Sequence, residues 1–250
     1  MLPIKRHGRA LVAATATALL LATAPAAMGQ PNSLNGSINP NKGPIGSPLR
    51  LTIGFRLDAD PGKEAGTLSK VDLFFPPNAR TNGALFPSCS PETINARRSF
   101  AGCPKGSKIG TGRIRADVPA ADVLDVPATM TIFNGRGGKS VTIHIYAENP
   151  VLISEAFTAP LTKTSGRFGY HLVAPIPPSL QEIADGWFAQ VRTLTSTISG
   201  WARNRSGRRI PYIQSTTLCP KSLSVPIASR IAFLRDYAPI SQSATIACRR

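Results

Sequence analysis

The chain has 250 residues and a formal net charge of +16, with 23 prolines and 21 glycines. So many proline and glycine residues favour turns and argue against a fold made of long helices. A chain of this length is enough for one large domain or two small ones.

The first 29 residues have the three parts of a secretory signal peptide. Basic residues open the chain, residues 10–24 are apolar or small, and small residues continue to Gly29. The apolar stretch is shorter and less apolar than the roughly 20 residues of a membrane-spanning helix, so we expect cleavage after Ala27 or Gly29. We therefore expect a secreted or cell-wall-associated protein. Three basic residues and no acidic one lie in the first 30 positions, so the mature chain keeps a net charge of +13.

Residues 30–48 are rich in Asn, Gly, Ser and Pro, which predicts a flexible lead-in that carries one short strand at 34–38. Residues 49–250 are predicted to form one β-sandwich domain. A boundary between two smaller sandwiches near residues 175–191 is the alternative, although no internal repeat favours it.

Apolar and polar residues alternate along many short segments after residue 48. This period of two places one face of each strand in a core and the other in water. The pattern is present at 49–57, 71–75, 113–118, 130–132, 141–146, 168–172, 223–233 and 244–248. Asn134-Gly135 with Gly137-Gly138 predicts a hairpin between two of these strands. We expect an all-β, antiparallel β-sandwich, immunoglobulin-like or jelly-roll-like, with an eight-stranded barrel as the alternative.

One segment has helical spacing instead. Ser179 and Glu182 fit a capping box, and apolar residues then recur at intervals of three and four up to Val191. Gly186 weakens this pattern. The sequence therefore predicts one short helix here.

All four cysteines lie in the mature part of the chain: Cys89, Cys103, Cys219 and Cys248. An even number in an exported chain indicates disulfide bonds, and three pairings are possible. We favour Cys89–Cys103 and Cys219–Cys248, because each pair flanks one local segment. The shorter loop is worth about 3 kcal/mol in the chain-entropy treatment. No CxxC spacing supports a zinc site.

Basic residues gather in two acid-free stretches, 93–116 and 186–235. Within the second stretch four arginines surround Ser206-Gly207, and this group is predicted to form a hairpin tip: Arg203, Arg205, Arg208 and Arg209. Such a tip is a candidate anion-binding patch, with Trp201 and Tyr212 beside it as stacking or core residues. The expected partner is an anionic cell-wall polymer or lipid surface rather than nucleic acid. The alternative is that the charge serves only solubility.

Motifs for catalysis are absent from the sequence, including GxSxG and HExxH. His144 and His171 fall at the polar positions of predicted strands, where structural or solvent-facing roles are expected. Asp58, Asp60 and Glu64 form a turn that could bind calcium, although a solvated turn is the favoured interpretation. We therefore expect no enzyme activity, no metal and no cofactor.

Several segments resemble a group of exported, uncharacterised actinobacterial proteins. These segments are 86–91, 103–112 and 217–220, together with Pro127, the 133–135 turn and the 169–170 strand. The resemblance covers most of the mature chain and implies a secreted or wall-associated β protein, but no activity.

These observations predict a binding or structural protein of the cell exterior, held to anionic envelope polymers by its basic patches. Two alternatives stay open. One is a secreted hydrolase with an unrecognised carboxylate site, and the other is a carrier whose sandwich encloses an apolar ligand.

Overall fold

A computed structural model describes residues 32–58, 66–203, 207–234 and 237–250. Eleven strands form one antiparallel sheet in the order β1-β2-β12-β5-β6-β7-β8-β9-β3-β16-β17. Their bounds are β1 Ser33–Asn39, β2 Arg50–Arg56, β3 Leu68–Phe75, β5 Lys108–Val118, β6 Val123–Asn134, β7 Ser140–Ala147, β8 Ile153–Lys163, β9 Tyr170–Pro175, β12 Gln190–Ile198, β16 Ser224–Phe233 and β17 Ile240–Ala247. The predicted antiparallel β class is confirmed.

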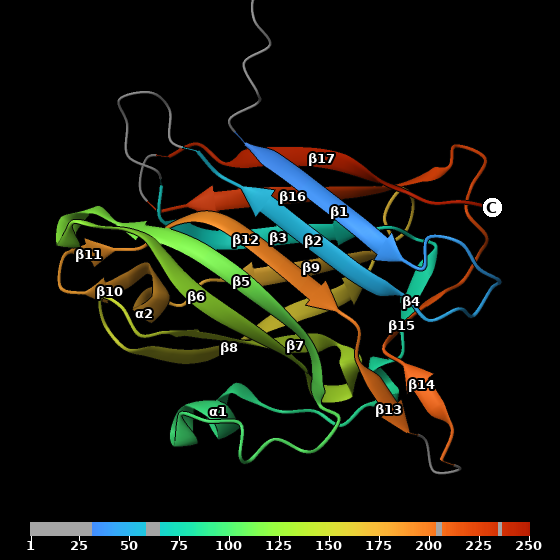
Figure 1. The fold of residues 1–250 in the computed structure, drawn as a ribbon, viewed down its shortest axis with the longest axis horizontal. Helices are drawn as coiled ribbons and strands as arrows, with labels where there is room; N and C mark the ends of the chain where they lie inside the picture. The colour runs from blue at the N-terminus through green and yellow to red at the C-terminus, as the bar shows by residue number, and fades with distance from the viewer. Residues whose placement is uncertain (1–31, 59–65, 204–206, 235–236) are drawn as a thin grey trace, which may run out of the picture.

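The sheet curls on itself, so that it is nearly closed. β2, β12, β5 and β6 lie in front of β3, β16 and β9, and the edge strands β1 and β17 contact each other (Figure 1). The front and back parts of the sheet are joined through β8, which pairs with β7 over Ile153–Pro160 but with β9 only over Leu161–Lys163. The sheet therefore splits beside the first part of β8.

The remaining short elements lie at the two ends of the sheet or on its outer face. They are β4 Ala79–Thr81 with β15 Ile213–Ser215, β10 Glu182–Ala184 with β11 Trp187–Phe188, β13 Trp201–Arg203 with β14 Arg209–Pro211, α1 Pro91–Arg97, α2 Pro178–Gln181, and the 3₁₀ turns Gly83–Leu85, Pro119–Ala121 and Arg136–Gly138. Neither α-helix in the part of the chain that the structure describes has the length and apolar character to span a membrane.

The predicted helix is wrong beyond its first turn. α2 ends at Gln181, and the chain continues as the short hairpin β10–β11. Gly186 adopts a φ of +72°, which belongs to a turn rather than a helix. The Glu182 carboxylate accepts a hydrogen bond from the Gly186 N–H at 2.8 Å and stabilises that turn instead of a helix start.

A second helix, α1, was not predicted. Its N-cap is Ser90, whose Oγ accepts a hydrogen bond from the Thr93 N–H at 3.4 Å, and Pro91 occupies the first helical position. α1 lies on the outer face of the sheet and buries Ile94 against Phe133 and Ala156.

Both predicted disulfides are confirmed. Cys89 is bonded to Cys103, and Cys219 is bonded to Cys248. The first bond holds the α1 segment together. The second lies where β16 begins and β17 ends, and these two strands form the expected antiparallel hairpin.

Candidate functional site

The interior of the curled sheet holds a cavity of about 220 Å³. Large apolar side chains from both layers line it, among them Phe55, Met130, Ile143 and Phe157. Space remains between them because small residues occupy other inward positions of the strands: Ala116, Ala128, Ala147, Ala174 and Ser196. The lining therefore combines large apolar side chains with small ones.

The lining of the cavity is almost entirely apolar. Among the described residues that line it, Arg80 is the only one with a charged side chain, and none is a carboxylate or a histidine. The phenols of Tyr170 and Tyr212 are the groups among these described lining residues that could act in acid–base chemistry. The arrangement instead suits burial of an apolar molecule.

Each end of the cavity is covered by a different segment. At one end Leu180, Ile183 and Ala189 line it, so the α2–β10–β11 segment covers the end where β8 and β9 separate. At the other end β4 and β15 pair with each other and contribute Ala79, Thr81 and Ile213 to the lining. There Tyr212 is 1% exposed and packs edge-on against Phe86, and burial raises the pKa of its phenol, so Tyr212 stays neutral.

The acidic residues are unevenly distributed along the strands. Most acidic residues that the structure describes lie at the end covered by α2, which we name the acidic end: Asp58, Asp117, Asp122, Asp125, Glu148, Glu155, Glu182 and Asp185. Only Asp72 and Glu92 among the described acids lie elsewhere. This distribution follows from antiparallel topology, because alternate connections return to the same end.

The opposite end, which we name the basic end, carries exposed cations: Lys42, Arg50, Arg80, Lys105, Lys108, Arg136, Lys139, Lys163, Arg167, Arg203, Arg208, Arg209, Lys221, Arg249 and Arg250. β4, β13, β14, β15 and the C-terminus all lie here (right side of Figure 1). A concentration of one charge sign on one surface attracts polyanions.

The predicted arginine hairpin is part of the basic end. β13 and β14 pair with Arg203 opposite Arg209, and both side chains are exposed, as is that of Arg208. Arg203 donates to the Gly207 carbonyl at 2.8 Å, and the Arg209 guanidinium lies 4.4 Å from the centre of the Trp201 ring. Arg205 lies outside the described residues. Tyr212 is a core residue, whereas Trp201 faces solvent beneath Arg209.

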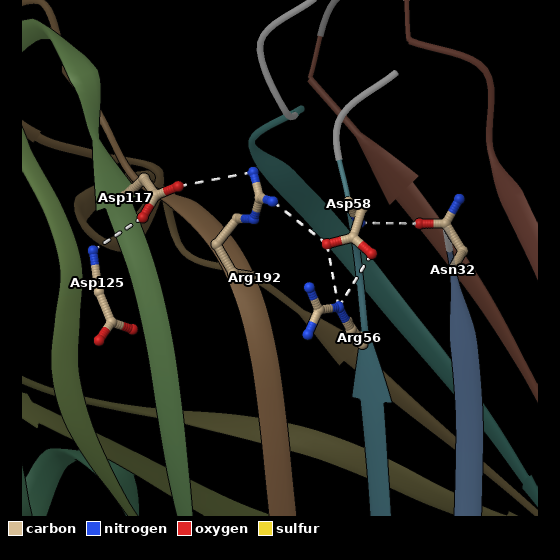
Figure 2. Close-up of polar contacts among 6 residues, drawn as sticks. All are labelled: Asn32, Arg56, Asp58, Asp117, Asp125 and Arg192. Atoms are coloured by element: carbon tan, nitrogen blue, oxygen red, sulfur yellow. Dashed lines mark hydrogen bonds and ion pairs between the residues drawn. The ribbon is translucent and has the colours of Figure 1, made fainter. Parts of the chain in front are cut away.

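At the acidic end Arg192 bridges two carboxylates (Figure 2). Its guanidinium nitrogens lie 3.3 Å from Asp58 and 3.6 Å from Asp117. Arg56 also binds Asp58 at 2.9 Å, and this hydrogen bond lowers the pKa of the Asp58 carboxyl. The network therefore ties the ends of β2, β12 and β5 together.

The calcium alternative finds no support in this arrangement. Asp58 contacts two arginines, and Asp60 and Glu64 lie outside the described residues. Within the described ranges no group of three or more His, Cys, Asp and Glu side chains is arranged to hold a metal ion.

The two histidines that the structure describes, His144 and His171, are hydrogen-bonded side chains on the outer face of the sheet. His144 is 4% exposed, lies 3.0 Å from the Ser154 hydroxyl and meets Phe100 edge-on. Burial lowers the pKa of His144. His171 lies 2.9 Å from Asp72 and stacks on Phe74. Both side chains point away from the core at alternate positions of their strands, and their hydrogen bonds fit structural roles.

The chain matches no protein-family model, no curated protein and no solved structure. The resemblance to exported actinobacterial proteins therefore stays a prediction, as does the signal peptide, which lies outside the described residues.

Proposed function

We propose that the protein is an extracytoplasmic carrier that holds an apolar ligand inside its curled sheet. The observation that carries this proposal is the 220 Å³ cavity with its apolar lining. The two disulfides fit an oxidising compartment outside the cytoplasm. We take the fold as a sandwich whose layers join at β8 and enclose the ligand.

The size of the cavity supports a ligand larger than a single ring. An engineered apolar cavity of about 150 Å³ stays dry and binds benzene. The cavity here is larger, at about 220 Å³. Each buried methylene contributes about 0.8 kcal/mol, so each added carbon of an alkyl chain should raise affinity about fourfold.

The test is a chain-length series of straight-chain alcohols, from hexanol to decanol, titrated calorimetrically into the mature protein. We expect affinity to rise about fourfold per methylene until the cavity is full. Absence of binding, or an affinity that does not depend on chain length, would contradict the proposal.

A matched pair of variants distinguishes the cavity from the surface. Ala128→Phe fills part of the cavity, because Ala128 lines it from β6. Thr129→Phe adds the same ring at the next position of β6, which is exposed. We expect Ala128→Phe to weaken alcohol binding at least tenfold, while Thr129→Phe leaves it unchanged.

A second candidate function is attachment to an anionic envelope surface, which is the role that the sequence alone favoured. The many exposed cations of the basic end, where few acids lie, support it. Exposed charges are screened within about 8 Å at physiological salt, so such attachment should weaken steeply as salt is raised. Co-sedimentation with purified cell walls over a salt series tests this function independently of ligand binding.

The hydrolase alternative gains no support from the described residues, because no carboxylate among them lines the cavity.

A further inference from the structure

The cavity and the basic end meet at β4. Ala79 packs on the core, whereas its neighbour Arg80 is exposed at the rim. Both residues belong to the lining of the cavity. Arg80 therefore stands at the boundary between the apolar interior and solvent.

A second cation lies close to this rim. Lys163 is paired directly opposite Tyr170, so the two side chains leave the sheet on the same face. Tyr170 lines the cavity, and its hydroxyl accepts a hydrogen bond from the Thr81 N–H of β4 at 3.3 Å. Tyr170 therefore connects the two strands that carry these cations: Lys163 lies opposite it in the sheet, and Arg80 precedes the residue that its hydroxyl binds. Both cations are exposed.

The opposite end of the cavity has the reverse character. Its lining there is mostly apolar, with Val118, Ile176 and Leu180 beside Asn149. Acidic side chains lie just outside, including Glu148 and Glu182. A negatively charged group would be repelled at the acidic end and attracted at the basic end. A neutral apolar molecule would gain nothing from this difference.

We propose that the ligand is an anionic amphiphile, whose alkyl tail fills the cavity while its carboxylate or phosphate head meets Arg80 and Lys163 at the basic rim. This inference rests on the proposed function. Two of the nitrogens of Arg80, Nη2 and Nε, face the side-chain amide of Gln214 at 2.7 and 3.0 Å, and the remaining guanidinium donors can bind either head group, while the lysine adds a second positive charge. The head remains in water, so its charge is not buried.

The test compares decanoate, decyl phosphate and decanol, which share one tail, on wild-type protein and two double variants. Arg80→Gln/Lys163→Gln removes the rim cations. Arg249→Gln/Lys221→Gln removes the same charge elsewhere on the basic end. Because two exposed charge contacts are lost, we expect the rim variant to bind decanoate and decyl phosphate about three- to tenfold more weakly, with decanol unchanged. The control variant should behave as wild type with all three probes.

The failures of the two proposals differ. If the rim variant binds decanoate and decanol as wild type does, the head-group inference is overturned and apolar ligand binding stands. If both double variants weaken decanoate equally, the rim is not the head-group site and the inference is likewise overturned. If none of the three probes binds wild-type protein, the proposed function itself fails.

Discussion

The side chain of Asn95 pairs with the backbone of Ala156 as a neighbouring strand would. Asn95 Nδ2 donates to the Ala156 carbonyl at 2.9 Å, and its Oδ1 accepts from the Ala156 N–H at 2.7 Å. Ala156 lies in the part of β8 that has no partner in β9, so α1 satisfies the strand edge where the sheet splits.

Removal of these two bonds should destabilise the fold. Asn95→Ala leaves two buried backbone groups of Ala156 without partners, and we expect a loss of about 2–4 kcal/mol in the free energy of unfolding. Urea denaturation measures this loss. Arg97→Ala, at an exposed position of the same helix, should change stability by less than about 0.5 kcal/mol. Equal effects of both substitutions would show that the Asn95 contacts contribute nothing specific.

The stability should depend on pH through His144. Its pKa is lowered in the folded protein by burial, whereas the unfolded chain titrates near about 6.5. As pH falls through that value the unfolded state gains a proton that the folded state does not bind, so stability falls on acidification. The urea midpoint should drop between pH 7.5 and 5.5, and His144→Gln should lack this component. An identical pH dependence in the variant would contradict the assignment.

The arginine hairpin should account for part of the binding to anionic surfaces. Replacement of Arg203, Arg205, Arg208 and Arg209 by serine should lower retention on anionic vesicles and reduce its salt dependence. A control with Arg97, Arg98, Arg113 and Arg230 replaced removes the same charge from exposed positions away from the hairpin. Equal loss of retention in both variants would assign the effect to net charge alone.

The N-terminus of the exported protein should lie between Ala26 and Pro31. The cluster of small residues after the apolar stretch predicts cleavage in this range. N-terminal sequencing of protein recovered from culture medium or cell walls measures the position. Retention of the first 24 residues would indicate an uncleaved anchor instead.

Much of the sheet could be predicted, because most of its strands alternate strictly. β12 could not, since a bulge shifts its register between Val191 and Thr193. Val191 and Leu194 therefore both line the cavity although they are three residues apart, and that spacing imitates a helix. β8 was missed because Pro160 interrupts its strand pattern.

The candidate site was less accessible to sequence reasoning. The disulfides and the arginine hairpin followed from local spacing. The cavity did not, because its lining brings together small residues such as Ala128 and Ala174 from strands that are distant in sequence. The position of Lys163 opposite Tyr170 likewise depends on strand register. The sequence did carry one signal for the acidic end, because many acidic residues lie in alternate connections between strands.

The central claim, that an apolar chain occupies the interior, is tested most directly by the position of a bound probe. Nuclear Overhauser effects from decanol to side-chain methyl groups report which residues the chain touches. The claim predicts contacts with Met130 and Ile143, which line the cavity and are 5% and 7% exposed. Contacts only with the surface residues Leu124 and Leu152, which are 67% and 61% exposed, would contradict it.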